Sequence, residues 1–178
     1  MVGLLIFIVY FSFISLGLPD SLLGTAWPLM HIELGADNEM AGIVACVVSV
    51  CPVISSLFSS QFIQRFGTGK VTLFSVLSTV IGLTGYALSK QVWLLFPSAV
   101  FLGIGAGAVD TALSNYVALH FKAKHMSWLH CFWGIGAMSG TYIMAAFLKQ
   151  QQWRTGFLAV SGVLAVIVIC LVFSQKLW

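Results

Sequence analysis

Two aspartates lie inside long apolar stretches of this sequence, where an ionisable side chain is costly. Asp20 stands in the segment G-L-P-D-S-L-L and Asp110 in G-A-V-D-T-A-L, so both segments fit the pattern G-x-x-D-[ST]-x-L. A charged side chain at the centre of a bilayer costs roughly 2.5–3.5 kcal/mol even on lenient insertion scales. We therefore predict that both carboxylates face a protein interior or a water-filled cavity. There each could take up and release a proton, or serve a structural role by hydrogen-bonding a neighbouring helix.

Asp110 also belongs to a stripe of small and polar residues. Gly103, Gly107, Asp110 and Ser114 recur at spacings of four, three and four, which places them on one side of a helix. Small residues at such spacings let the backbone of another helix approach closely. We expect this stripe to face a neighbouring helix or a wet cavity.

Further polar and aromatic side chains are candidates for proton transfer or solute binding. His130, in W-L-H-C-F-W-G, could relay protons near neutral pH or serve as a packing or interfacial residue. Asn115 could hydrogen-bond a sugar hydroxyl or hold another helix, and Trp27 and Trp133 are aromatic candidates for the solute site. No Ser/His/Asp triad and no H-E-x-x-H pattern can be assembled, so we expect no enzyme activity, cofactor or metal site.

The composition indicates a membrane protein. The chain has 178 residues, of which 60% are hydrophobic and only 7% are charged. A soluble domain of this length needs more charge to cover its surface. The net charge of +3 is small and dispersed, so nucleic acid is not an expected partner. The expected surroundings are a lipid bilayer.

The apolar runs are long enough for six membrane spans of about 20 residues or more. The predicted spans cover residues 3–30, 40–64, 71–88, 92–119, 126–148 and 153–173. Because the connecting loops are short, we predict a single all-α bundle over residues 1–178. Pro19 lacks a backbone donor, so the first span should be kinked beside Asp20.

The shared aspartate pattern suggests an internal repeat. It occurs in the first and fourth spans, which are three spans apart. Two units of three spans each insert in opposite directions, which gives an inverted-topology repeat. Asp20 and Asp110 should then lie at related positions about one pseudo-two-fold axis.

The basic residues predict the orientation. With the N-terminus inside, five basic residues lie at cytoplasmic ends and three at outer ends, in agreement with the positive-inside rule. The inner set is Arg65, Lys70, Lys122, Lys124 and Lys176, and the outer set is Lys90, Lys149 and Arg154. We therefore expect a multi-pass protein of the cell membrane with both termini in the cytoplasm.

The turn after the second span resembles that of the major facilitator superfamily, whose motif there is G-x-x-x-D-R-x-G-R-[RK]-[RK]. Arg65, Gly67 and Lys70 match this motif, while Ser60 replaces its first glycine and Gln64 its acid. With its six spans and short loops, the chain is similar to the N-terminal half of such a transporter. The resemblance implies that this turn is a cytoplasmic gate element, without the charge pair that the acid would make.

Within that superfamily the chain is most similar to the fucose-permease-like sugar:proton symporters. That branch has an aspartate in span one and an acid in span four, matched here by Asp20 and Asp110. Residues 129–137, L-H-C-F-W-G-I-G-A, match its L-H-x-x-[FW]-G-x-G-A pattern. The resemblance implies proton-coupled transport of a sugar or similar small polar solute, with the proton and the solute as ligands.

The sequence ends at Trp178, shortly after the sixth predicted span. A transporter of this family has a second six-helix half, so we expect this chain to be one half and the other half to be its partner. Two alternatives stay open. The chain could be a truncated remnant or assembly partner that transports nothing, or two copies could form a small transporter or channel.

Overall fold

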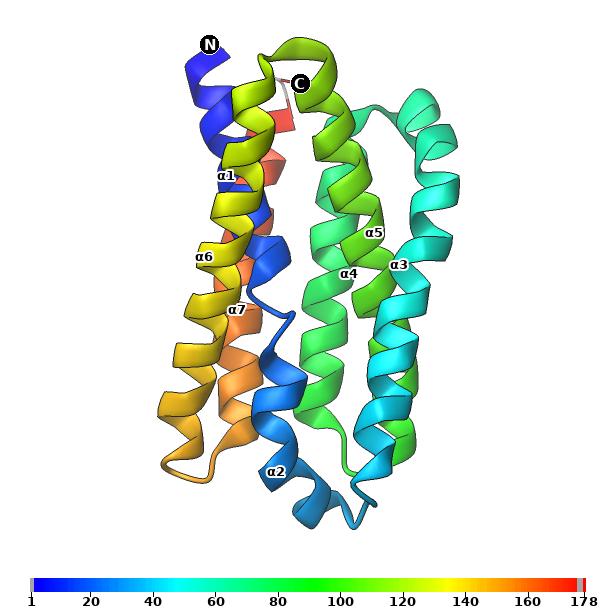
Figure 1. The fold of residues 1–178 in the computed structure, drawn as a ribbon, viewed down its shortest axis with the longest axis vertical. Coiled ribbons are helices and arrows are strands. Elements are labelled where there is room, and N and C mark those ends of the chain that lie inside the picture. Colours follow the sequence, from blue (N-terminus) through cyan, green and yellow to red (C-terminus); the bar gives the residue numbers. More distant parts are fainter. Residues whose placement is uncertain (1, 176–177) are drawn as a thin grey trace.

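The computed structural model describes residues 2–175 and residue 178. Seven α-helices and one short 3₁₀ helix make up the described part, and Figure 1 shows the long helices side by side in one bundle. They are α1 (Val2–Gly17), α2 (Leu22–Leu34), α3 (Glu39–Phe66), α4 (Thr68–Leu88), η1 (Val92–Leu94), α5 (Leu95–His120), α6 (Ala123–Leu148) and α7 (Trp153–Ser174).

These helices confirm the six predicted spans. Six stretches are long and apolar enough to cross a membrane, with α1 and α2 together forming the first and η1 and α5 the fourth. The chain begins and ends at the same end of the bundle (Figure 1), as an even number of spans requires. The α3–α4 turn and the α5–α6 loop, which carry four of the five basic residues predicted inside, lie at this end too. The fifth, Lys176, lies outside the described residues.

The first span is broken between α1 and α2, as Pro19 predicts. The backbone N–H of Asp20 donates to the Gly17 carbonyl at 3.1 Å, and that of Leu22 to the Pro19 carbonyl at 3.2 Å. In these turn hydrogen bonds the N–H of residue i donates to the carbonyl of residue i−3. In an α-helix it would donate to the carbonyl of residue i−4. The proline ring and its missing donor account for the interruption. Asp20 therefore lies in an irregular turn inside a membrane span.

The packing of the helices follows the predicted inverted repeat. The first span packs against α6 and α5 packs against α3, which are equivalent pairs in the two repeats, and α4 packs against α7. The packing departs from the symmetry in one place, since α4 packs closely on α5 while α7 has little contact with the first span. Each glycine that opens a G-x-x-D motif meets the second helix of the other repeat: a Cβ on Gly17 would collide with the carbonyl oxygen of Trp133, and one on Gly107 with that of Pro52. The fold is therefore an all-α membrane bundle of two inverted three-helix repeats.

At the opposite end of the bundle, α2 continues to Leu34, four residues beyond the predicted end of the first span. The side chain of Glu33 holds this last turn in place. It accepts hydrogen bonds from the Trp153 indole and from Arg154 Nε, the latter at 3.0 Å. Arg154 also donates to the carbonyl of Ala87 at 2.9 Å, so one guanidinium joins the ends of α2, α4 and α7.

Candidate solute and proton site

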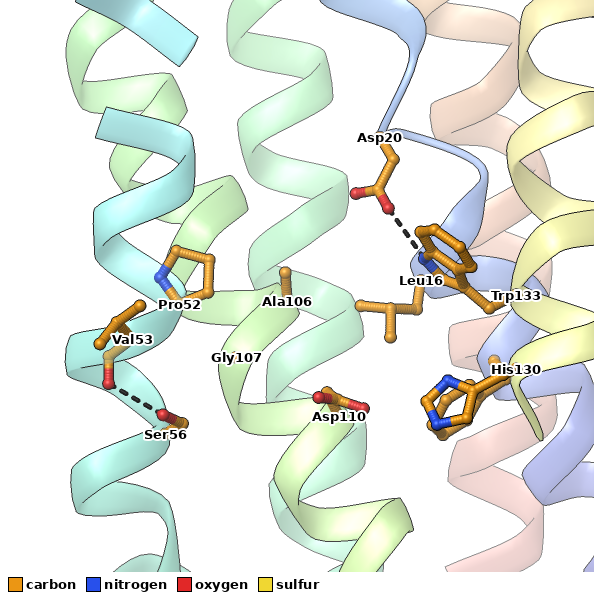
Figure 2. Close-up of a pocket in the computed structure, with 11 residues that line it drawn as sticks. Leu16, Asp20, Pro52, Val53, Ser56, Ala106, Gly107, Asp110, His130 and Trp133 are labelled. Atoms are coloured by element: carbon orange, nitrogen blue, oxygen red, sulfur yellow. Dashed lines mark hydrogen bonds between the residues drawn. The ribbon is translucent and has the colours of Figure 1, made fainter. Parts of the chain in front are cut away.

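One cavity of about 460 Å³ gathers most of the predicted chemical residues. Its walls come from α1, the α1–α2 break, α3, α5 and α6, which are parts of the first two spans of each repeat. Figure 2 shows the cavity between α3 and α5 on one side and the first span and α6 on the other. The lining residues are Phe13, Leu16, Asp20, Pro52, Val53, Ser56, Ala106, Gly107, Asp110, His130 and Trp133.

Asp20 reaches this cavity from the broken segment of the first span. The indole Nε1 of Trp133 donates to Asp20 Oδ2 at 2.8 Å, as the dashed line in Figure 2 shows. This distance is well within the usual hydrogen-bond range, so the contact orients the carboxyl group. The other oxygen, Oδ1, has no hydrogen-bond partner among the side chains that the structure describes.

Asp110 reaches the cavity from an uninterrupted helix, α5. The hydroxyl of Ser114, one turn further along, donates to Asp110 Oδ1 at 3.2 Å. This distance exceeds the usual range for O–H···O bonds, so the carboxyl group is held only weakly. As the stripe of small residues predicts, Gly103 and Gly107 pack against α3 while Asp110 faces the cavity.

His130 and Trp133 line the cavity from α6. They are three residues apart, so they project from the same face of the helix. His130 makes an edge-to-face contact with Phe13, with ring centroids 6.1 Å apart. In Figure 2 its imidazole lies at the level of Asp110, while Trp133 lies toward Asp20. Two carboxyl groups, an imidazole and an indole therefore share one cavity.

The structure does not bring Asn115 or Trp27 to this cavity. Asn115 is five residues beyond Asp110, which rotates it about 140° around α5, and it is exposed elsewhere on the helix. Trp27 is buried in α2, stacked on His31 at a centroid distance of 6.3 Å. Its indole N–H has no hydrogen-bond partner among the described residues. Solute binding by these two residues stays a prediction.

The predicted gate residues lie at the α3–α4 turn, away from the cavity. The connection is a single residue, Gly67, at φ +82°, where a side chain is strained. Its N–H donates to the Ile63 carbonyl at 2.8 Å and closes the end of α3. The guanidinium of Arg65 lies 5.5 Å from the centre of the Phe66 ring, and Lys70 is exposed on the first turn of α4.

The sequence analysis missed the contribution of α3 to the cavity. Pro52, Val53 and Ser56 form the wall opposite the first span, and Figure 2 shows them on one face of that helix. Pro52 in mid-span and the frequent serines after it were the available signals. The Glu33–Trp153–Arg154 contact was missed as well, because its members lie 120 and 121 residues apart.

A cavity with a few polar side chains at the interface of two inverted three-span repeats is the architecture of secondary membrane transporters. The family model of the Major Facilitator Superfamily matches residues 6–176. The chain belongs to that superfamily.

Two relatives show what proteins of similar sequence transport. The chain is 23% identical over 164 residues to the vacuolar membrane amino acid uptake transporter fnx2 of Schizosaccharomyces pombe, covering 90% of this chain and 28% of that protein. It is 22% identical over 139 residues to a D-xylose transporter of Levilactobacillus brevis, covering 74% of this chain and 30% of that protein. The chain thus spans about a third of the length of these curated relatives.

A solved structure supports the fold. The crystal structure of a POT family transporter in complex with 5-aminolevulinic acid matches 98% of this chain and 38% of its own chain, with a TM-score of 0.78 and 24% identity. At that identity the likeness concerns the arrangement of the helices alone.

Proposed function

We propose that this chain forms one wall of the translocation pathway of a transporter that couples proton movement to transport of a sugar or similar small polar solute. One observation carries the proposal: the aspartates of the two repeated motifs line the same cavity. Carboxylates inside membrane spans are expensive and mark ion or proton pathways. Asp20 and Asp110 belong to repeats related by the pseudo-two-fold axis. A site between such repeats can be opened alternately to either side of the membrane.

The cavity chemistry favours an uncharged polyhydroxylated solute over an anion. None of the lining residues described is lysine or arginine, so no permanently charged cation offsets a negative solute on this wall. Carboxylate oxygens accept hydrogen bonds from hydroxyl groups, and the Trp133 ring offers a large apolar surface beside them. The D-xylose transporter among the relatives supports this class of solute. The amino acid transporter among them makes an amino acid the solute to test against it.

The proton coupling follows from the aspartates. A protonated carboxyl group is neutral and can donate a hydrogen bond, whereas the ionised form only accepts. Solute binding and proton binding at Asp20 and Asp110 would therefore depend on each other. We assign His130, in the same cavity, as the residue that passes protons to and from these carboxyl groups.

A partner must complete the pathway in this proposal. The relatives are about three times as long as this chain, and in transporters of this architecture one bundle rocks against another around the solute. A second six-helix half, or a second copy of the chain, would supply the facing wall.

Reconstitution in proteoliposomes tests the proposal. The chain is assayed alone and together with a six-helix C-terminal half of a superfamily transporter, using radiolabelled xylose or alanine with and without an inward proton gradient. We expect gradient-driven xylose accumulation only with both halves present. Alanine accumulation in place of xylose would contradict the solute class. Equal uptake with and without the gradient would contradict the coupling, and full activity of the chain alone would favour a self-paired assembly.

The same proposal places both termini in the cytoplasm of a cell-membrane protein. Reporter fusions at Lys122, in the α5–α6 loop, and at Asp37, in the α2–α3 loop, test this orientation. We expect the Lys122 fusion to report the cytoplasm and the Asp37 fusion the outside. The reverse result would overturn the orientation.

A further inference from the structure

A second hollow lies on the outside of the bundle and shares no lining residue with the cavity. It is a groove of about 740 Å³ between α3, α4 and α5. Its lining is dominated by large apolar side chains, six of which are 46–64% exposed. They are Ile54, Phe58, Phe62, Phe66, Phe74 and Ile104.

The groove has the depth of one leaflet of a bilayer. It follows α3 from Ile54 to Phe66, and these residues are about 18 Å apart along the helix at a rise of 1.5 Å per residue. The hydrocarbon core of a bilayer is about 30 Å thick, so each leaflet is about 15 Å deep. The groove ends where α3 turns into α4, at the end of the bundle where the chain begins (Figure 1).

Serine hydroxyls along the groove already donate hydrogen bonds within the protein. The hydroxyl of Ser55 donates to the Ile104 carbonyl at 2.8 Å, and that of Ser78 to the Phe101 carbonyl at 2.7 Å. Ser75 donates to the Val71 carbonyl at 2.7 Å within α4. These hydroxyls need no outside partner, so the length of the groove suits a hydrocarbon chain.

Two basic residues lie at the α3–α4 turn, where the groove ends. Phe66 and Val71, which flank the α3–α4 turn, both line it. The Arg65 guanidinium lies 5.5 Å from the centre of the groove-lining Phe66 ring, and the exposed Lys70 directly precedes Val71. No acid occurs in residues 60–70, so nothing in the turn itself neutralises these two charges.

We propose that this groove binds an acyl chain of an anionic phospholipid, with the lipid phosphate held by Arg65 and Lys70. An amphiphile with a charged head and a hydrocarbon tail of one-leaflet length matches both features at once. A transmembrane helix would cross both leaflets and leave two cations against an apolar surface. Guanidinium and ammonium groups are the usual protein partners of phosphate oxygens.

Native mass spectrometry of the full chain tests the proposal. The protein is equilibrated with equal amounts of phosphatidylglycerol and phosphatidylcholine of the same acyl chains, and the retained lipids are counted. Each basic side chain near a membrane surface strengthens association with anionic lipid by about fivefold. We therefore expect R65Q/K70Q to lower retention of phosphatidylglycerol by about thirtyfold and to leave phosphatidylcholine unchanged.

Two further variants make the result decisive. K122Q/K124Q removes two cations at the same end of the bundle but away from the groove, and should retain phosphatidylglycerol as the unmodified chain does. Ala108→Trp fills the groove with a large side chain. It should reduce retention of phosphatidylglycerol although Arg65 and Lys70 are unchanged. Equal retention of the two lipids, or an unchanged R65Q/K70Q, would overturn the proposal. A dimer that Ala108→Trp dissociates would show that a second copy, not a lipid, occupies the groove.

Discussion

The two copies of the G-x-x-D motif have the same backbone contact but different surroundings for the aspartate. In both, the glycine meets a carbonyl oxygen on the second helix of the other repeat. In the first copy the helix breaks and Asp20 accepts an indole hydrogen bond at 2.8 Å. In the second, α5 continues and Asp110 has only Ser114 at 3.2 Å among the described side chains.

Two residue differences explain this asymmetry. Pro19 stands between the glycine and the aspartate of the first motif, where the second motif has Val109, so only the first helix must break. The glycine contacts also define equivalent positions on the partner helices, which are Trp133 on α6 and Pro52 on α3. Tryptophan offers an N–H donor to the nearby carboxylate and proline offers none. Related backbones therefore carry one tightly held and one loosely held carboxyl group.

The largest expected effect concerns the carboxyl groups themselves. In the assembled transporter, Asp110→Asn and Asp20→Asn should each abolish proton-driven accumulation, because an amide keeps the shape of the side chain but cannot carry a proton. Uptake against a gradient in proteoliposomes measures this. Asp37→Asn, in the α2–α3 loop, is the matched control and should accumulate solute normally. If only one of the two motif variants loses coupling, the repeats do not share the proton function.

The helix break gives the next prediction. Val109→Pro places in α5 the residue that breaks the first span, and should destabilise the protein by about 3 kcal/mol or more because it removes a helical hydrogen bond in a buried segment. Pro19→Val should change stability by less than about 1 kcal/mol, since the turn bonds around it involve other donors. Denaturation of the protein in detergent measures both. Equal costs would mean that Pro19 does not explain the break.

The motif glycines should behave alike. Gly17→Ala and Gly107→Ala each push a methyl group into a backbone carbonyl, which should cost about 1–3 kcal/mol of stability through overpacking. Gly24→Ala and Gly134→Ala are the controls, since a Cβ at either site meets nothing within 4 Å. These controls should be neutral or stabilising by about 0.5–1 kcal/mol, because alanine is the better helix former. A tolerated Gly107→Ala beside a damaging Gly17→Ala would break the equivalence of the two contacts.

The smallest effect concerns the indole hydrogen bond. Trp133→Phe keeps an aromatic ring in the cavity but removes the donor to Asp20, and should slow solute uptake about tenfold, as expected for a lost hydrogen bond to a charged group. Trp128→Phe, on the same helix but outside the cavity, should leave uptake unchanged. An unaffected Trp133→Phe would show that the firmer hold on Asp20 has no role in transport.

Much of the architecture could be predicted from the sequence because it depends on local properties. The lengths of the apolar runs determined the six spans, and Pro19 determined the break in the first. The spacing of Gly103, Gly107 and Asp110 predicted that these residues share the face of α5 that packs on a neighbouring helix or lines a cavity. The repeated motif predicted the inverted repeat, because its two copies lie three spans apart in the sequence.

The tertiary structure alone decided which side chains share the cavity. Trp133 and Asp20 are 113 residues apart, and their hydrogen bond depends on how α6 is rotated and shifted along the first span. The position of α3 likewise decides that Pro52 and Ser56 complete the cavity wall. The rotation of α5 decides that Asn115 is exposed away from the cavity. Hydropathy and periodicity constrain each helix separately. The rotation and register between helices depend on close packing, here of glycines against carbonyl oxygens, which exists only in the assembled bundle.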